Sequence, residues 1–423
     1  MKNSTARKLK QIPEGYLIVG VDPHKKRHAA VAMTQDALTR SKFKVVNSRR
    51  GYEELLERAR VQMVVTGSRG VIFAIETASH FWRNLAYFLE ERGVPFRLIN
   101  PFTLKRRREG RDLNRVKNDL QDAEVAAELL RTGEFTETRL PQGIYAELRA
   151  AYNAYRRLVK ERGRWLNLLK GLLDGVFPEF DQVFKDPAGK TALAVLSLCP
   201  VPGVIVGMTE EEYVAMIRVG DGRLRLKLRK LRALHQVART SIGIGAGTQS
   251  VSVELCLLAE RLRLNGEQVD KMEDLLVGLV DSIGDSQYLL SVRGLSYITV
   301  AGILAELGPL RSYQNAKQVI KMAGSNPIEA ESAGKRASHT PMSKKGRPGL
   351  RWCIWMAAIS LLRHNADFRS WAKTRGERPV HAHPLKKKEV IGAAANRLLR
   401  LAYALVNKQT LYRLPQLAEE VVS

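Results

Sequence analysis

The sequence predicts an α/β domain at the N-terminus followed by a mainly α-helical remainder. Between residue 16 and about residue 133, short apolar runs alternate with helical periodicity, whereas beyond residue 145 the periodicity is helical almost throughout. Three apolar runs precede the alternation, which favours a mixed sheet flanked by helices. With 423 residues, 45% of them hydrophobic, the chain is long enough for two or three domains with sizeable cores.

The first apolar run ends on a carboxylate. Tyr16–Asp22 has the pattern of a buried strand, and residues 28–34 form a returning strand after a tight turn. Asp is a poor strand residue, and burying it unpaired costs on the order of several kcal/mol, so Asp22 is expected to be paired or to bind a cation. The other elements expected in this domain are strands at 42–47, 71–76 and 95–99 and helices from Tyr52, Phe81 and Asp119.

Three further acids have positions that suit a shared metal site. Glu76 ends the apolar run 71–75, and Asp119 and Asp122 share one face at the start of a predicted helix. For any one acid alone, a helix cap or a solvated charge is the better explanation. Two strand-end and two helical carboxylates together favour a two-metal Mg²⁺ site around a phosphodiester, with Asp22, Glu76, Asp119 and Asp122 as ligands and catalytic residues.

The charge balance indicates a polyanionic partner. Lys and Arg number 69 against 43 Asp and Glu, which gives a net charge of +26 and a pI near 10.1. Nucleic acid is favoured over a membrane because the chain has no apolar run of about 18 residues. A basic protein without such a partner is the less favoured alternative.

The N-terminus and the cysteines indicate the compartment. Residues 1–10 are polar and no signal peptide is recognisable, so the protein is expected to be cytoplasmic and nucleoid-associated. Residues 1–15 are expected to form a basic, loosely ordered arm. Cys199, Cys256 and Cys353 are odd in number and lack metal-site spacing, which predicts reduced core thiols.

A basic cluster separates the fifth predicted strand from the Asp119 helix. It lies within residues 100–112, beside Phe102, and comprises Lys105, Arg106, Arg107, Arg108 and Arg111. Next to a metal site such residues suit a grip on phosphates, although a solvated basic loop explains them nearly as well.

Long helices are predicted after a boundary at residues 140–141. Residues 145–177 and 252–283 each have helical periodicity, and 223–239 predict a strongly basic amphipathic helix. The two long helices are expected to pair as an antiparallel arm or to dimerise, and glycines within the first argue against a regular coiled coil.

Two segments of the C-terminal part suit nucleic-acid chemistry. Residues 289–301 predict a helix, a turn with Arg293 and Gly294, and a helix, which resembles a helix-hairpin-helix element that presents backbone N–H groups to phosphate. A plain helical hairpin is the equal alternative. Residues 326–348 form a loop rich in Gly, Ser and Lys before an apolar helix at 350–362, and Ser332 lies there among small and basic residues.

Several of these residues match a known pattern. Residues 117–123 have the order Lys-x-Asp-x-x-Asp-Ala, and the later match comprises Gly324, Pro327, Ser332, Ser343-Lys344-Lys345-Gly346 and Leu350-Arg351. By these residues the chain resembles, over nearly its whole length, the DEDD transposases of the insertion-sequence 110/1111 group, relatives of the pilin-gene invertases. It departs from the pattern once, because Ala333 separates Ser332 from Gly334.

The resemblance implies a domain order and a mechanism. It implies a basic arm at 1–15, a RuvC-like domain of RNase H type at 16–140, a helical or coiled-coil linker at 141–285 and a C-terminal transposase domain at 286–423. Ser332 would attack the scissile phosphate and form a 5′-phosphoserine link, so that strands are exchanged without ATP. The four acids would bind Mg²⁺, or Mn²⁺ in its place.

The resemblance also implies partners. These are double-stranded donor and target DNA, a structured bridge RNA whose loops pair with both, and further copies of the chain in a homo-oligomer, a dimer of dimers. The basic residues expected to contact nucleic acid in the C-terminal part are Arg293, Lys335, Lys344, Lys345, Arg347 and Arg351.

Three other functions stay open at this point. One is a RuvC-like metal-dependent endonuclease or junction resolvase, in which water attacks and Ser332 is incidental. Another is a DNA invertase of the same family. The third is a non-catalytic DNA- or RNA-binding protein whose acids are structural.

Overall fold

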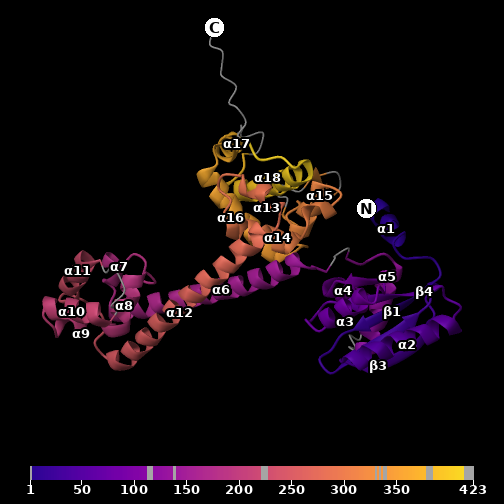
Figure 1. Ribbon diagram of the computed structural model, residues 1–423, viewed down its shortest axis with the longest axis horizontal. Coiled ribbons are helices and arrows are strands. Elements are labelled where there is room, and N and C mark those ends of the chain that lie inside the picture. The colour runs from indigo at the N-terminus through magenta and orange to yellow at the C-terminus, as the bar shows by residue number, and fades with distance from the viewer. Residues whose placement is uncertain are drawn as a thin grey trace, which may run out of the picture. The chain divides into compact units, whose positions relative to one another are not determined.

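The chain forms two compact units, Met1–Leu140 and Pro141–Ser423 (Figure 1). The computed structural model describes residues 2–111, 118–136, 140–220, 227–328, 331–332, 335–336, 341–377 and 384–413. Sheet and helices share the first unit, whereas helices dominate the second. The predicted division into an α/β part and a helical part is therefore confirmed.

The first unit is built on a five-stranded mixed sheet. Its strands have the spatial order β3-β2-β1-β4-β5. β1 and β2 are antiparallel, as are β2 and β3, whereas β4 pairs in parallel with both β1 and β5. The bounds are β1 Tyr16–Asp22, β2 Arg27–Met33, β3 Thr39–Val46, β4 Gly70–Glu76 and β5 Phe96–Ile99. Every predicted strand is present, within a few residues of its expected ends.

Helices pack on both faces of this sheet because its strands are apolar on both sides. Alternate residues of β1, Leu17, Val19 and Val21, share a core with α2 and α3. Ile18 on the other face packs with Val125 and other residues of α5. The helix bounds are α1 Lys2–Leu9, α2 Arg49–Val65, α3 Trp82–Glu91, α4 Pro101–Arg111 and α5 Asp119–Arg131.

Two segments are helical that the sequence predicts as irregular. The expected loose arm contains α1, and Lys8 of that helix lies over the ring of Phe135 at 5.2 Å. Residues 101–111 of the basic segment are not a loop, since they form α4. Asn100 starts α4 by accepting a hydrogen bond from the N–H of Phe102 at 2.8 Å.

Two long helices run along each other in the second unit (Figure 1). α6, Ile144–Val176, and α12, Thr248–Asp281, are antiparallel. Asn265 donates to the carbonyl of Leu158 at 3.2 Å, and Arg162 donates to that of Leu262 at 3.0 Å. One end of the pair packs in each of the two cores of this unit.

The two cores hold the remaining helices. The first core surrounds the C-terminal end of α6 and the N-terminal end of α12. It also includes short helices, which are only in part predicted from the sequence. These are α7 Phe180–Val183, α8 Lys190–Leu198, α9 Pro202–Val206, α10 Glu210–Gly220 and α11 Leu228–Ala238. Cys199 is buried here, Cys353 is buried in the other core and Cys256 is half-buried, and all three are free thiols.

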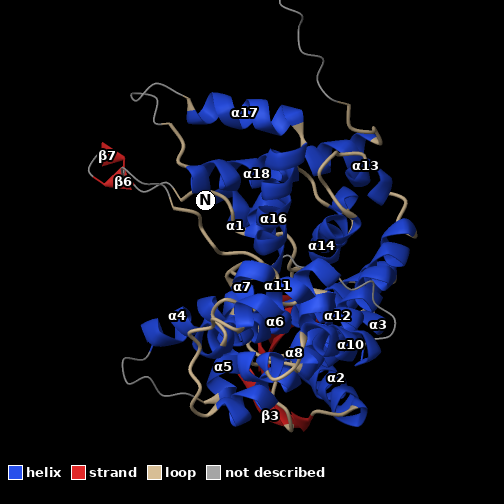
Figure 2. Ribbon diagram, turned by 90° about the vertical axis from the view of Figure 1, so that its left-hand side faces the viewer, coloured by secondary structure: helices blue, strands red, loops and turns tan. Residues whose placement is uncertain are grey.

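The second core contains the C-terminal helices (Figure 2). Their bounds are α13 Ser286–Leu290, α14 Tyr297–Leu307, η1 Leu310–Ser312, α15 Ala316–Ala323, α16 Pro348–His364, α17 Ala366–Gly376 and α18 Lys387–Lys408. The predicted helix, glycine-containing turn and helix are present as α13 and α14, and Ser296 caps α14 by accepting from the N–H of Thr299. Phosphate binding by this turn stays a prediction. Within the described ranges, no helix is both long and apolar enough to cross a membrane.

A backbone pairing brackets the segment that contains residue 332. Pro327 and Met342 form an antiparallel bridge, and the N–H of Ile328 donates to the carbonyl of Pro341 at 2.8 Å. Between them lie the two-residue antiparallel strands β6, Glu331–Ser332, and β7, Lys335–Arg336 (Figure 2). Ala333 and Gly334, where the family pattern is interrupted, lie outside the described residues.

Candidate active site

The carboxyl ends of two parallel strands hold Asp22 and Glu76. Val21 of β1 pairs with Ile75 of β4. Asp22 and Glu76 follow these residues, so they end strands about 4.8 Å apart. Both side chains are buried, at 6% and 7% exposure. Two like charges in such a position are costly unless a cation or hydrogen-bond donors offset them.

Gly20 lets α5 approach the strand that ends in Asp22. A Cβ at position 20 would lie 1.9 Å from the carbonyl oxygen of Ala123 and 2.7 Å from the backbone nitrogen of Ala127. Only glycine permits this contact between helix and strand backbones. Because side chains alternate along a strand, positions 20 and 22 share the face that α5 covers. The packing therefore brings the first turn of α5 to the end of β1.

Asp119 and Asp122 lie in that first turn. Asn118 caps α5 by accepting from the N–H of Leu120 at 3.0 Å, which fixes where the helix begins. Two carboxylates at a helix N-terminus also interact favourably with the helix dipole. Asp122 is buried at 3% exposure, whereas the side chain of Asp119 is 40% exposed.

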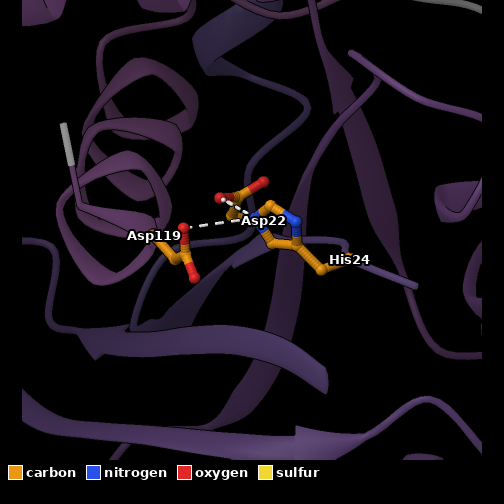
Figure 3. Close-up of side chains that lie close together, drawn as sticks. All are labelled: Asp22, His24 and Asp119. Atoms are coloured by element: carbon orange, nitrogen blue, oxygen red, sulfur yellow. Dashed lines mark hydrogen bonds and ion pairs between the residues drawn. The ribbon is translucent and has the colours of Figure 1, made fainter. Parts of the chain in front are cut away.

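His24 lies between two of these carboxylates (Figure 3). Its Nε2 lies 3.1 Å from Oδ2 of Asp22 and 3.3 Å from Oδ1 of Asp119. Nζ of Lys44 lies 3.5 Å from the other oxygen of Asp119. The sequence analysis did not identify His24 as a site residue. The available signal was its position, two residues beyond an acid that ends a strand.

Arg108 forms an ion pair with Asp122, the last of the four predicted acids. Its Nη1 donates to both carboxylate oxygens of Asp122, at 2.5 and 2.7 Å, and the two side chains are 16% and 4% exposed. The pair offsets the cost of burying Asp122. The sequence predicts a phosphate contact for Arg108, whereas its partner in the structure is a carboxylate of the site itself.

The other basic residues of α4 differ in their surroundings. Lys105 and Arg106 are exposed. Nζ of Lys105 lies 3.7 Å from the exposed carboxylate of Glu109, and the guanidinium of Arg106 lies over the ring of Phe102 at 4.5 Å. Arg107 instead forms an ion pair with Glu134. Lys105 and Arg106 are therefore the α4 cations most open to a partner among those whose side chains the structure describes.

In the second unit, two of the predicted contact residues are bonded to the protein. Arg347 donates to the carbonyl of Glu306, and burial, with the nearby charge of Arg149, lowers the pKa of Arg347 to about 10. Arg351 donates to the carbonyl of Ala323 at 2.8 Å. These contacts join the start of α16 to α14 and α15.

The remaining predicted residues of this unit are exposed or are described by their backbone alone. Lys344, Lys345 and Arg293 have exposed side chains. Ser332 pairs with Lys335 across β6 and β7. Ser332 thus belongs to the second unit, whereas the four acids belong to the first.

The donors at the ends of β1 and α5 suit a divalent cation. Asp22, His24 and Asp119 each offer one ligand atom, and these atoms lie within 4.8 Å of one another. Carboxylate oxygens are preferred by Mg²⁺ and Mn²⁺, and imidazole is a common ligand of transition ions. Glu76, on the strand beside Asp22, supplies a further carboxylate.

Two family models match the chain. Residues 19–178 match a model described as a transposase, of the DEDD type of IS110, and residues 286–373 match one described as the transposase IS116/IS110/IS902 family. An uncharacterized protein of insertion element IS116 from Streptomyces clavuligerus is 26% identical over 385 residues, which cover 87% of this chain and 90% of that protein.

A second relative is described as a transposase. The transposase for insertion sequence element IS1111A from Coxiella burnetii is 24% identical over 350 residues, which cover 81% of this chain and 79% of that protein. The first family match includes all four acids, and the second includes residue 332. The chain therefore belongs to the IS110 family of DEDD transposases.

Proposed function

We propose that this transposase cuts and rejoins the DNA strands of a mobile element and its target, under the guidance of a structured bridge RNA and through a 5′-phosphoserine link on Ser332. The observation that carries the proposal is the convergence of Asp22 and Asp119 at the ends of a strand and a helix, with the buried Glu76 at the end of the neighbouring parallel strand. Asp122 lies three residues beyond Asp119, in the same first turn of that helix. A fold that merely needed stability would not gather acids there.

The family implies a divalent cation, and the four acids would hold it. A bound Mg²⁺, or Mn²⁺, would neutralise charge on the scissile phosphate and on the attacking and leaving oxygens. The protein supplies a rigid frame, because Asp22 and Glu76 are fixed by strand pairing and Asp119 by the capped start of α5. Arg108 would release Asp122 or share it with the cation.

Ser332 would supply the nucleophile. Its Oγ would lose a proton and bond to phosphorus, the bond from phosphorus to the 3′ oxygen would break, and that oxygen would leave as a 3′-hydroxyl after gaining a proton. The new phosphoserine ester conserves the energy of the phosphodiester, so reversal of the step onto another strand rejoins the DNA. The proposal rests on the family match, which includes residue 332, and on the neighbouring basic residues.

The charge of the chain supports a nucleic-acid partner. A net charge of +26 suits a phosphate backbone, and backbone contacts make binding sensitive to salt. Base pairing by the RNA would then supply sequence specificity while the protein recognises shape. Sequencing the RNA that co-purifies with the protein tests this part: one structured species is expected, and only random fragments of host RNA would contradict guidance.

Trapping a protein–DNA adduct tests the nucleophile. With nicked suicide substrates, guide RNA and Mg²⁺, the wild type is expected to form an adduct that resists denaturation, with the modification on Ser332 in mass spectrometry. Ser312→Ala is a control at an exposed serine of the same unit, outside the residues of the family pattern, and keeps the adduct. Cleavage without an adduct, unchanged in Ser332→Ala, would instead identify a nuclease or junction resolvase in which water attacks.

The two units invite a further test, because the acids and Ser332 lie in different units. We infer that the acids of one chain act with Ser332 of another chain in the oligomer. Asp22→Asn and Ser332→Ala proteins are each expected to be inactive, whereas their mixture regains cleavage with adducts only on chains that keep Ser332. A mixture that stays inactive although mixed oligomers form would assign both parts to one chain.

A further inference from the structure

We propose that His24 is a cation ligand of the acid site and that the buried His28 positions it. The inference rests on the proposed cation site but concerns a residue outside the four acids. It assigns one nitrogen ligand to a site otherwise made of oxygen, which favours transition ions such as Mn²⁺ over Mg²⁺.

The ring of His24 lies between two carboxylates of the acid site. One atom, Nε2, lies within 3.3 Å of carboxylate oxygens from two different elements, Asp22 of β1 and Asp119 of α5. A ligand atom at the meeting point of two carboxylates is where a shared cation would need it. The side chain of His24 is 46% exposed, so an incoming ion and its water can reach the ring.

His28 fixes the backbone of His24 by accepting a hydrogen bond from it. The N–H of His24 donates to Nδ1 of His28 at 3.1 Å. His28 is fully buried, and because the N–H of His24 donates to Nδ1, that ring nitrogen is the one without a proton. Its ring stacks on Tyr52 with centroids 5.5 Å apart and planes 13° apart.

The second ring nitrogen of His28, Nε2, indicates that this histidine does more than stabilise the fold. Within the part of the chain that the structure describes, its buried Nε2 has no hydrogen-bond partner. A buried polar atom without a partner destabilises the fold, and an apolar ring would avoid that cost. The benefit is the hydrogen bond that fixes the turn bearing His24.

A second contact fixes the same turn. Nδ2 of Asn47 lies 3.1 Å from the carbonyl of Lys25 and 3.4 Å from that of His24. Tyr52 donates from its hydroxyl to Oδ1 of Asn47. The buried His28 and Tyr52 and the half-buried Asn47 thus support this turn, as outer residues do around many metal-bound histidines.

Mn²⁺ binding to the full-length protein without DNA tests the ligand. Pulsed electron paramagnetic resonance is expected to show a ¹⁴N coupling from imidazole, and His24→Asn should remove it and weaken Mn²⁺ binding about tenfold or more relative to Mg²⁺. His80→Asn is the matched control, since His80 is an exposed histidine four residues beyond Glu76. The inference is overturned if the coupling is absent from the wild type or survives in His24→Asn.

Two substitutions test the support. His28→Phe keeps the stacked ring but removes the acceptor, and it is expected to lose the ¹⁴N coupling. His28→Asn offers an oxygen near the position of Nδ1 and is expected to regain it. If neither variant changes the coupling or both remove it, the positioning role is wrong, whatever the effect on folding.

The same assay separates this inference from the proposed function. Asp22→Asn is expected to weaken both Mn²⁺ and Mg²⁺ binding. If it does so while His24→Asn changes nothing, the acid site stands and the assignment of His24 fails. If Asp22→Asn also binds both ions normally, the proposed cation site itself fails.

Discussion

The side chains of the acid site and those of the basic segments of this transposase are held in place in different ways. Asp22 and Glu76 are fixed by the pairing of β1 with β4 and are buried. The cations of α4 and of residues 344–351 divide instead into exposed side chains and side chains already bonded to protein oxygens.

This difference shows which charged residues can be given a role from the sequence alone. A carboxylate at the end of a buried strand has few explanations, since burial forces a partner on it. An arginine in a basic cluster has many, because its long side chain can reach protein carbonyls, carboxylates or phosphates. Arg108 and Arg347 bond to the protein, whereas Lys105 and Lys344 are exposed.

The largest effect is expected where the acid site depends on backbone packing. Gly20→Ala would place a Cβ 1.9 Å from the carbonyl oxygen of Ala123, so α5 must move away from β1. We expect a loss of about 3 kcal/mol in stability and faster hydrogen exchange at the amides of α5, together with loss of cleavage. Gly110→Ala is the control, since a Cβ there meets nothing within 4 Å. Unchanged exchange in α5 would contradict the packing argument.

The sequence predicts much of this region for physical reasons. The five strands follow from apolar runs of strand length, and the acids follow from the cost of burying charge. The role of Gly20 is not predictable in this way, because it depends on how a helix one hundred residues later docks. The sequence analysis does not predict α4, although Asn100 and Pro101 are a start signal, because its run of arginines hides any apolar face.

A smaller effect separates bonded from exposed cations in the second unit. Arg347→Gln removes a half-buried donor to the carbonyl of Glu306 and is expected to lower the free energy of unfolding by about 2 kcal/mol. Its effect on the salt dependence of DNA binding should be small. Lys344→Gln is the matched variant and should do the reverse. Thermal unfolding and salt titrations measure both, and a flatter salt slope in Arg347→Gln alone would reverse the assignment.

The smallest effect is expected from substitutions in α4, on the salt dependence of nucleic-acid binding. Neutralising Lys105, Arg106, Arg107 and Arg108 together should flatten the plot of log affinity against log salt, by about 0.9 for each phosphate of duplex DNA that the variant no longer neutralises. Most of the change is expected from Lys105→Gln with Arg106→Gln, because these two side chains are exposed, whereas Arg107 and Arg108 are half-buried and paired with Glu134 and Asp122. An equal change from the Arg107 and Arg108 pair would place those residues in the interface, and no change from all four would exclude α4 from it.

The central claim is that the carboxylates at the strand ends hold the cation used in strand cleavage. Cleavage by Asp22→Asn in Mg²⁺, with RNA binding measured on the same preparation, tests it most directly. The substitution keeps the shape of the side chain and removes its charge, so cleavage is expected to fall at least about a hundredfold while RNA binding stays nearly intact. Asp119→Asn and Asp122→Asn should behave alike. Full cleavage by Asp22→Asn in Mg²⁺ would contradict the account.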